Sequence, residues 1–351
     1  RFAGALAARL PSATHDYALG EATLLRMLSE TQGVTVTLEQ LERVGQDDLA
    51  RNSAALEAAA RAIDPARDMR SVVAEVIADK PAIADMVATA SAQAVEARAF
   101  VLERGLVAIP DSHLAEVRET PPYMRFNIAF LDGSGPFEKK RMPSFYYISP
   151  PETSWPEAQQ RDYVPDRSSL ASITVHELWP GHYLHALHMK AQRSRVLRTF
   201  RNYATSEGWA HYAEALMAEH GFAPSQQAAR FRVGQLVMAL VRDVRFVSAI
   251  GLHARGMTVE QSAALFRERA MQDTGNAEQQ AARGTFDPMY GSYTLGKLMI
   301  LKLRADYRAR EEAAGRPFVL RDFHDRFLSY GAPPIPVIRQ EMLGPDAGPP
   351  L

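Results

Sequence analysis

Two short stretches of this chain contain residue types that act together in metal chemistry. The first holds His176, Glu177 and His182, and the second, 25 residues after His182, begins at Glu207. Neutral imidazoles and carboxylates are ligands for zinc, and a glutamate beside such ligands can activate water for hydrolysis. The pattern indicates a zinc hydrolase for which the rest of the chain is the scaffold.

The interval between the two histidines departs from the usual zinc motif. In His-Glu-x-x-His the histidines are four residues apart and share one face of a helix. Here they are six residues apart, which on a straight helix would put them on sides roughly 120° apart. Pro180 and Gly181 lie within the interval; proline removes a helical hydrogen bond, and glycine tolerates unusual dihedral angles. We predict a kink or two-residue bulge there that brings His182 beside His176.

These stretches resemble a bacterial family known as domain of unknown function 885, which is grouped with zincin-like, gluzincin-like metallopeptidases. The resemblance is carried by His176-Glu177-Leu178-Trp179-Pro180-Gly181-His182-Tyr183-Leu184-His185 and Glu207-Gly208-Trp209-Ala210-His211-Tyr212-Ala213-Glu214. Further matching segments are Gly251-Leu252-His253, Tyr293-Thr294-Leu295-Gly296-Lys297, and the ending from Phe323-His324-Asp325 to Gly331-Ala332-Pro333-Pro334. The resemblance thus runs through most of the chain and implies a zincin-like fold.

The first stretch is also similar to the thimet oligopeptidase motif, His-Glu-Phe-Gly-His-x-x-His, with two residues inserted before the Gly-His pair. In that family a glutamate on the next helix is the third ligand. The resemblance implies that His176, His182 and Glu207 bind one Zn²⁺ and that Glu177 is the general base.

Amide hydrolysis also needs a group that stabilises the negative charge developing on the carbonyl oxygen. Tyrosine or histidine donors are the usual partners of zinc in this role. Tyr293 is the first candidate and His253 the second, with Tyr290 as an alternative to Tyr293. Each of the three can instead be an ordinary packing or hydrogen-bonding residue.

The neighbouring titratable residues admit a structural interpretation beside the functional one. A glutamate in the first turn of a helix, as Glu207 is expected to be, is commonly a capping or dipole residue. Glu214 can orient a ligand imidazole through its second nitrogen, or it can be a solvated surface residue. Three further histidines are expected to support the ligands, face the substrate or serve structure alone: His185, His188 and His211.

Composition limits the partners of the chain. The 40 Lys and Arg against 41 Asp and Glu leave a formal net charge of -1, so no basic surplus indicates nucleic acid or an anionic membrane. No cysteine is present, which assigns any metal to His, Asp and Glu. No apolar run approaches the roughly 20 residues that span a bilayer, so membrane insertion is not expected. Small peptides or neutral small molecules are the expected substrates.

The first residues, Arg1-Phe2-Ala3, lack both a methionine and an apolar leader. We expect a soluble fragment or processed form of a longer precursor, exported to the periplasm if a signal peptide preceded Arg1.

The 351 residues, 46% of them hydrophobic, can bury a large core as one domain, 1–351. Residues 1–105 are expected to be helical. Thr37-Leu38-Glu39-Gln40 is a capping box, Asp64-Pro65 ends the first long helix, and a second runs from Pro81 to Arg104 before Gly105.

Residues 106–165 are rich in proline and predict a small sheet, with strands at Leu106–Ile109, Leu114–Val117 and Ser144–Ile148. Residues 166–351 are expected to be helical again, with Ser168 or Ser169 capping the helix that carries His176. Further helices are predicted near residues 196–220, 225–250, 258–272, 291–314 and 319–330.

Two features of the middle part have substrate-binding interpretations. Ser144–Ile148 can be an edge strand that aligns an extended peptide through main-chain hydrogen bonds, or a buried strand whose aromatic side chains belong to the core. Arg125 can recognise a carboxylate, or it can be solvated or form a salt bridge.

The sequence therefore predicts a mostly α (α+β), zincin-like metallohydrolase with a small β-sheet next to the metal-site helix. The predicted activity is zinc-dependent hydrolysis of peptide bonds in short peptides, with endo- and exopeptidase action both open. A catalytically degenerate peptide-binding protein without metal is one alternative. A purely structural helical module is the other, and it predicts that side chains 176, 182 and 207 lie far apart.

Overall fold

The two long helices of the first third end where the sequence predicts. The structure is a computed structural model that describes residues 1–351 apart from residues 15, 126 and 141. Helix α3 (Leu38–Ile63) follows Thr37, whose side chain exchanges hydrogen bonds with Gln40 as a capping box. Helix α5 (Met86–Arg104) ends at Gly105, which adopts a left-handed conformation with φ of 59°. The other helices of this part are α1 (Phe2–Arg9), α2 (Glu21–Gln32) and α4 (Met69–Ala78).

The predicted capping box and both helix ends are confirmed, whereas the start of the second helix was predicted too early. Residues Ile83–Asp85 form a separate 3-10 turn, and the α-helix begins only at Met86.

A three-stranded sheet follows, and two of its three strands overlap predicted ones. It consists of β1 (Glu116–Glu119), β2 (Ala129–Asp132) and β3 (Phe145–Ile148) in the order β1-β3-β2, with β1 parallel and β2 antiparallel to β3. The strand predicted at Leu106–Ile109 is absent, and β2 was not predicted. Because β3 is paired on both sides, it cannot be the edge strand that its sequence suggested.

The remaining chain is helical. Helix α7 (Arg167–Glu177) is capped by Asp166, whose carboxylate accepts hydrogen bonds from the backbone N–H groups of Ser168 and Ser169. The two serines are therefore the capped residues and not the cap. The other helices are α6 (Glu157–Tyr163), α8 (His182–Lys190), α9 (Arg195–Thr199), α10 (Tyr203–Glu219), α11 (Ala228–Ala254), α12 (Val259–Ala270), α13 (Thr274–Phe286), α14 (Ser292–Ala313), α15 (Leu320–Leu328) and α16 (Ile335–Leu343).

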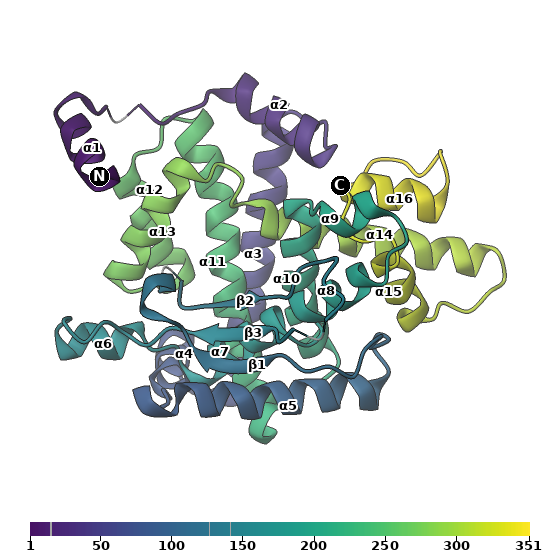
Figure 1. Cartoon of the computed structure of the whole chain (residues 1–351), viewed down its shortest axis with the longest axis horizontal. Helices are drawn as coiled ribbons and strands as arrows, with labels where there is room; N and C mark the ends of the chain where they lie inside the picture. The colour runs from purple at the N-terminus through teal and green to yellow at the C-terminus, as the bar shows by residue number, and fades with distance from the viewer. Residues whose placement is uncertain (15, 126, 141) are drawn as a thin grey trace.

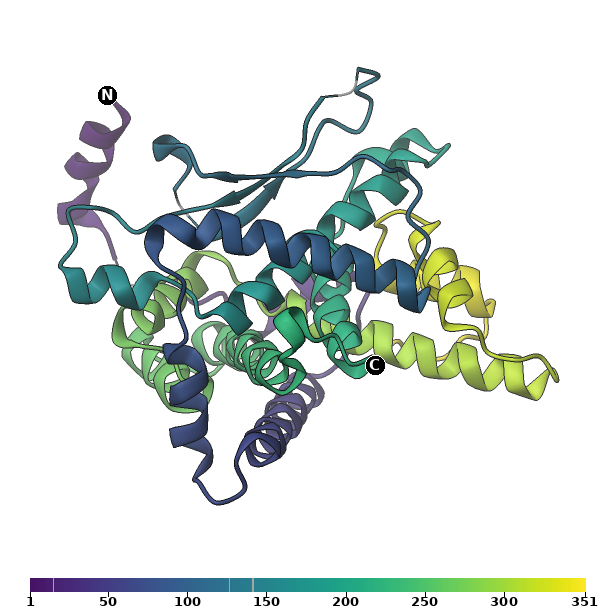
Figure 2. The same ribbon diagram turned by 90° about the horizontal axis from the view of Figure 1, so that it is seen from below.

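The long helix α11 runs through the body of the molecule, packed against α3, α7 and α12 (Figure 1). The sheet covers α7 and borders α5, as the view from below also shows (Figure 2). Helix α10 packs against α7 and α14. The predicted mostly helical fold with a small sheet beside the helix of His176 is confirmed. Among the described residues, no helix is both long and apolar enough to cross a membrane.

Candidate metal centre

The predicted break lies between α7 and α8. Helix α7 ends at Glu177 and α8 begins at His182. A Cβ atom on Gly181 would lie 1.8 Å from the backbone oxygen of His176, so only glycine lets the chain turn back this closely. The indole Nε1 of Trp209 donates a hydrogen bond of 2.8 Å to the carbonyl oxygen of Pro180. Helix α10 thereby holds the break in place.

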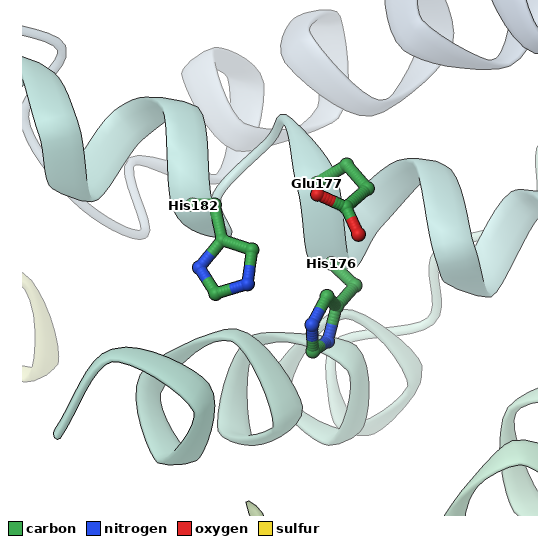
Figure 3. A group of neighbouring side chains, drawn as sticks. All are labelled: His176, Glu177 and His182. Atoms are coloured by element: carbon green, nitrogen blue, oxygen red, sulfur yellow. The ribbon is translucent and has the colours of Figure 1, made fainter. Parts of the chain in front are cut away.

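This break puts the two imidazoles side by side (Figure 3). Their ring centroids are 4.6 Å apart, with the ring planes nearly perpendicular. Atom Oε2 of Glu207, from α10, lies 3.2 Å from Nε2 of His176 and 3.2 Å from Nε2 of His182. The structural-module alternative predicted that these three side chains lie far apart, and that prediction is wrong.

Glu177 completes the group. One potential ligand atom from each of His176, Glu177 and His182 lies within 4.8 Å of the other two. Glu177 also accepts a 3.0 Å hydrogen bond from the backbone N–H of Leu131, in the edge strand β2. Burial raises the pKa of Glu177 above its ordinary value, while the nearby imidazoles act in the opposite direction. A carboxylate with a raised pKa is a better proton acceptor from water at neutral pH.

Buried groups behind His176 set its orientation. Its Nδ1 lies 2.7 Å from Oε1 of Glu214, whose side chain is completely buried. The same carboxylate forms a 2.9 Å ion pair with Arg242 and accepts a 2.9 Å hydrogen bond from Ser172 Oγ. Of the two expectations for Glu214, the structure therefore shows the imidazole-orienting one. A neutral His176 whose Nδ1 proton is donated to Glu214 would present its Nε2 to a ligand.

The carboxylates of the group are ionised and stabilise a positive charge on His176. Burial alone would lower the pKa of His176, but hydrogen bonds to Glu207 and Glu214 raise it to about 9. The pKa of Glu207 is held below its ordinary value because the two imidazoles outweigh the opposing effect of burial. Arg242 outweighs burial in the same way at Glu214. Both carboxylates are therefore negatively charged at neutral pH.

The donor set fits a zinc ion. Zinc bonds to His nitrogen and carboxylate oxygen are about 2.0–2.2 Å long, so neighbouring ligand atoms of a tetrahedron are about 3.3–3.6 Å apart. The two separations of 3.2 Å between Glu207 Oε2 and the imidazole nitrogens are close to the lower end of this range. Three ligands of this kind leave the fourth position free, as in catalytic zinc sites.

Tyr293 lies beside this group because α10 and α14 cross closely. Its ring stacks on the ring of His176, with centroids 6.0 Å apart. At the crossing, a Cβ on Gly208 would lie 2.5 Å from the backbone of Gly296, and one on Gly296 would lie 1.9 Å from the carbonyl oxygen of Ala204. The two glycines therefore let α14 bring Tyr293 next to Glu207. Burial raises the pKa of Tyr293, which keeps its hydroxyl protonated as a donor.

His253 does not join the group. Its Nε2 pairs with the carbonyl oxygen of Gly284 at 2.7 Å, and its ring packs against Tyr17. It follows Arg242 on α11 by 11 residues, a rise of about 16 Å. Tyr290 is also fully buried beside Gly284. The prediction of His253 or Tyr290 as an oxyanion donor thus has no support in this geometry.

The other histidines of the motifs have structural positions: two pair with backbone carbonyl oxygens, and one is completely buried. Nε2 of His185 lies 3.0 Å from the carbonyl oxygen of Gly331, and Nε2 of His188 lies 2.9 Å from that of Ala108. These are structural hydrogen bonds between α8 and distant loops. His211 is completely buried, with its Nδ1 3.7 Å from Glu214 Oε1.

Arg125 pairs with groups of the protein itself. It forms a 2.7 Å ion pair with Glu119 and donates to the carbonyl oxygen of Thr120. The salt bridge, one of its predicted interpretations, is confirmed.

Arg242 and Ser172 are site residues that the sequence did not reveal. Ser172 lies one helical turn before His176, and this spacing puts both on one face of α7; this was the available signal. Arg242 comes from a different helix, 66 residues after His176, and no local pattern connects the two.

A surface hollow of about 390 Å³ lies elsewhere, at the start of α7. It is lined by Asp79, Asp85, Gln93, Glu96 and Arg167, among others. Arg167 and His176 are nine residues apart on α7, or about 13 Å along the axis. The hollow is therefore separate from the His and Glu group.

Comparison with known proteins gives a family and a fold. A family model described as "Bacterial protein of unknown function (DUF885)" matches residues 1–342. A candidate lipoprotein of unknown function from Shewanella oneidensis is 24% identical, with a TM-score of 0.82 over 97% of this chain and 62% of that one. A candidate lipoprotein from Colwellia psychrerythraea is 22% identical, with a TM-score of 0.81 over 95% of this chain and 57% of that one.

The chain thus spans less than two thirds of the length of either structure. No curated protein matches it.

Proposed function

Because the chain belongs to the bacterial DUF885 family, whose description names no activity, we propose a function from its site: zinc-dependent hydrolysis of amide bonds in short peptides. His176, His182 and Glu207 would hold the zinc ion, and Glu177 would be the general base. The fold would then be zincin-like.

One observation carries the proposal. A single carboxylate oxygen, Oε2 of Glu207, lies at the same distance of 3.2 Å from the Nε2 atoms of both imidazoles. The three side chains come from α7, α8 and α10, and converge only because Pro180 and Gly181 break the helix. Mutual hydrogen bonds without a metal would also explain the distances, but a buried carboxylate behind His176 is the usual support for a metal-ligating histidine.

The chain's own residues have separable tasks in this proposal. Zinc at this position would supply a Lewis acid and a water of lowered pKa. Glu177 accepts the proton of the attacking water and passes it to the leaving amine nitrogen. Tyr293 donates its hydroxyl hydrogen to the oxygen that gains charge. Glu214 keeps the Nε2 of His176 directed at the metal position.

The edge strand β2 is the candidate surface for an extended substrate. It is bonded to β3 on one side only, so its other side is open to a peptide strand. The N–H of Leu131 already reaches Glu177 from this side. A peptide added here would run beside the general base. Two structures of similar fold are described as candidate lipoproteins, which supports export as the proposed location.

The proposal is tested by comparing two variants with the wild-type chain, all prepared without chelator. Glu177→Gln keeps the acceptor for Leu131, so we expect one bound zinc per chain and a loss of about 10²–10⁴-fold in peptide turnover. Glu207→Ala removes a ligand and should lose both zinc and turnover. Zinc is measured by mass spectrometry and turnover with a peptide library. Turnover retained by Glu177→Gln would remove Glu177 as the base.

A metal-free peptide-binding protein remains the second candidate function. It is favoured by the hydrogen bonds between Glu207 and the two imidazoles, which satisfy all three groups without a cation. It predicts wild-type protein without zinc that binds peptides and leaves them intact. The same metal analysis and library digest separate it from the enzyme.

A further inference from the structure

Three arginines surround the ring of Tyr293, and one of them has no acidic partner. Arg242 pairs with Glu214 at 2.9 Å, and Arg283 pairs with Asp287 at 2.8 Å. Arg245 instead donates to the neutral side-chain oxygen of Gln280 at 2.8 Å. Within the described part of the chain, its only other contact of this kind is with the Tyr293 ring. The cluster therefore carries one positive charge that the protein itself does not neutralise.

The unpaired charge of Arg245 is energetically costly because the side chain is partly removed from water. Arg245 is half-buried on α11, and burial lowers its pKa. Arginine nevertheless keeps its proton in proteins, so it remains a partly desolvated cation. Such a group is stabilised by a planar anion, and its paired N–H donors match a carboxylate.

The side chains between Arg245 and the metal centre are partly exposed. His182 and Glu207 are 18% and 20% exposed at their side chains. Tyr203, Tyr293 and Arg283 are half-buried as well. These residues form a continuous, partly open face that joins the metal centre to the arginines, because the Tyr293 ring contacts His176, Tyr203 and Arg245.

The distances suit the end of a peptide. Cζ of Arg245 lies 5.2 Å from the centroid of the Tyr293 ring, which lies 6.0 Å from the centroid of the His176 ring. These two distances add to 11.2 Å, the largest separation of Arg245 Cζ and the His176 ring that they allow. An extended chain advances about 3.3–3.6 Å per residue. The carboxylate of a leaving group one or two residues long falls within this range.

We propose that Arg245 binds the terminal carboxylate of a short peptide on the leaving-group side of the cleaved amide, so that the chain acts as a C-terminal exopeptidase. This inference rests on the hydrolase function proposed above. In the reaction, water oxygen bonds to the carbonyl carbon, the C–N bond breaks, and the water proton taken by Glu177 goes to the amine nitrogen. The released amino acid or dipeptide keeps its carboxylate at Arg245.

The first test compares three N-blocked tetrapeptides with the zinc-loaded wild-type chain. One ends in a free carboxylate, one has the same sequence with a terminal carboxamide, and one is a carboxamide with glutamate as its last residue. If Arg245 forms a charged hydrogen-bonded pair with the terminal carboxylate, kcat/KM should be at least about 10-fold higher for the free acid than for the carboxamide of the same sequence. Equal rates for acid and amide would overturn the proposal. A preference for the glutamate-ended amide would overturn the terminal carboxylate as the ligand.

Variants of Arg245 provide the second test of the proposal. Arg245→Gln should lower kcat/KM for the free acid on the order of 10- to 100-fold, mainly through KM, and should lower kcat/KM for the carboxamide much less. Arg245→Lys keeps the charge without the planar fork and should fall between. The matched control is Arg232→Gln, since Arg232 lies on the same helix with a glutamine oxygen as its partner, about 20 Å away along the axis. It should keep the wild-type preference.

A binding measurement separates this inference from the hydrolase proposal. Calorimetry on zinc-free protein should show binding of the free-acid peptide, weaker binding of the carboxamide, and loss of the difference in Arg245→Gln. If this pattern holds while no hydrolysis is found, the hydrolase fails and the carboxylate site stands. If peptides are cleaved but acid and amide bind and react alike, Arg245 is not the site and the hydrolase stands.

Discussion

Each nitrogen of the His176 ring faces a different carboxylate, and this division matters for the function of the residue. Nδ1 faces Glu214, which is buried and neutralised by Arg242, whereas Nε2 faces the partly exposed Glu207. Removing one partner of a buried ion pair strongly destabilises the folded protein. Glu214 therefore serves both the orientation of His176 and the local stability.

Replacing Glu214 with Gln should weaken zinc binding by about 10–100-fold, because the Nδ1 proton of His176 loses its charged acceptor. It should also lower the free energy of unfolding by about 3–5 kcal/mol, since Arg242 is left without its carboxylate. Zinc affinity is measured by competition with a chromophoric chelator, on protein shown to be folded by circular dichroism.

The control is Ser172→Ala, which removes only the hydroxyl partner of Glu214. It should lower the free energy of unfolding by about 0.5–1.5 kcal/mol and leave zinc affinity within a few-fold of wild type. An unchanged zinc affinity in folded Glu214→Gln would contradict the orienting role.

The residue types of the site could be predicted from the sequence, but their partners could not. His176, Glu177, His182 and Glu207 stand in two short motifs, so type and spacing suffice to select them. Glu214 had two equal interpretations because its burial depends on α7 and α11 packing over it. The roles of Arg242 and Arg245 follow from contacts with distant helices, which no local pattern encodes.

At the scale of elements, close backbone approaches position the site. Gly181 permits the break between α7 and α8, and Gly208 and Gly296 permit the crossing of α10 with α14. At each of these glycines two main chains lie in direct contact, because no side chain separates them. The motifs Glu207-Gly208 and Tyr293-Thr294-Leu295-Gly296 thus each join a functional side chain to the glycine that places it.

Gly296→Ala should separate α10 from α14, because the new Cβ would lie 1.9 Å from the carbonyl oxygen of Ala204. Overpacking of this kind costs about 1–3 kcal/mol, against a gain of about 0.5–1 kcal/mol in helix propensity. Turnover should fall more than zinc affinity, since α14 carries Tyr293 and no proposed ligand. Urea unfolding, zinc titration and kinetics measure the three quantities.

Gly4→Ala is the matched control, because Gly4 lies within the exposed helix α1 and a Cβ there meets nothing within 4 Å. It should leave stability unchanged or raise it by up to about 1 kcal/mol. If Gly296→Ala proves as stable as this control, the crossing tolerates a side chain and our account of Tyr293 fails.

Elements with strong end signals were predictable, and those defined by pairing were not. Thr37, Gly105 and the Pro180-Gly181 pair encode their effects locally, through capping and dihedral freedom. Strand β2 is only four residues long, so it becomes a strand through its bonds to β3. Strand β3 has the strongest β-forming sequence of the sheet. It is central because β1 and β2 pair with its two sides.

At the scale of the whole molecule, a buried charge network connects three long helices. Lys297 of α14 forms a 2.6 Å ion pair with Asp48 of α3, and both side chains are almost fully buried. Asp243 of α11 accepts hydrogen bonds from Asn52 at 2.7 Å and Thr294 at 3.0 Å. Asn52 and Asp243 are 191 residues apart along the chain, and Asp48 and Lys297 are still farther apart, so only the complete fold brings them together.

The two carboxylates of this network titrate in opposite directions. Burial, supported by the nearby Asp48, raises the pKa of Asp243 to about 7, whereas Lys297 overcomes burial and lowers the pKa of Asp48 to about 2. One lysine thus holds one of the two carboxylates ionised. The other keeps its proton in the folded state up to near-neutral pH.

The pH dependence of stability should reveal the buried proton on Asp243. An unfolded Asp ionises near pH 3.9, so between about pH 4 and 7 the folded chain binds more protons than the unfolded chain. The contribution of Asp243 to stability therefore falls as pH rises through this window, by up to about 1.4 kcal/mol per pH unit. Asp48, whose pKa is lowered, contributes stability that is lost only as pH falls from about 4 towards 2.

Asp243→Asn removes this proton uptake, so wild type should lose stability relative to the variant as the pH rises from 4.5 to 7.5. Guanidinium unfolding of both proteins, prepared free of zinc, measures the difference at each pH, and contributions from other groups such as His176 cancel in it. Asp47→Asn, at an exposed carboxylate of α3, controls for the loss of one negative charge. A difference between wild type and Asp243→Asn that stays constant over this range would mean that Asp243 is ionised in the folded protein, and that Lys297 serves both carboxylates at once.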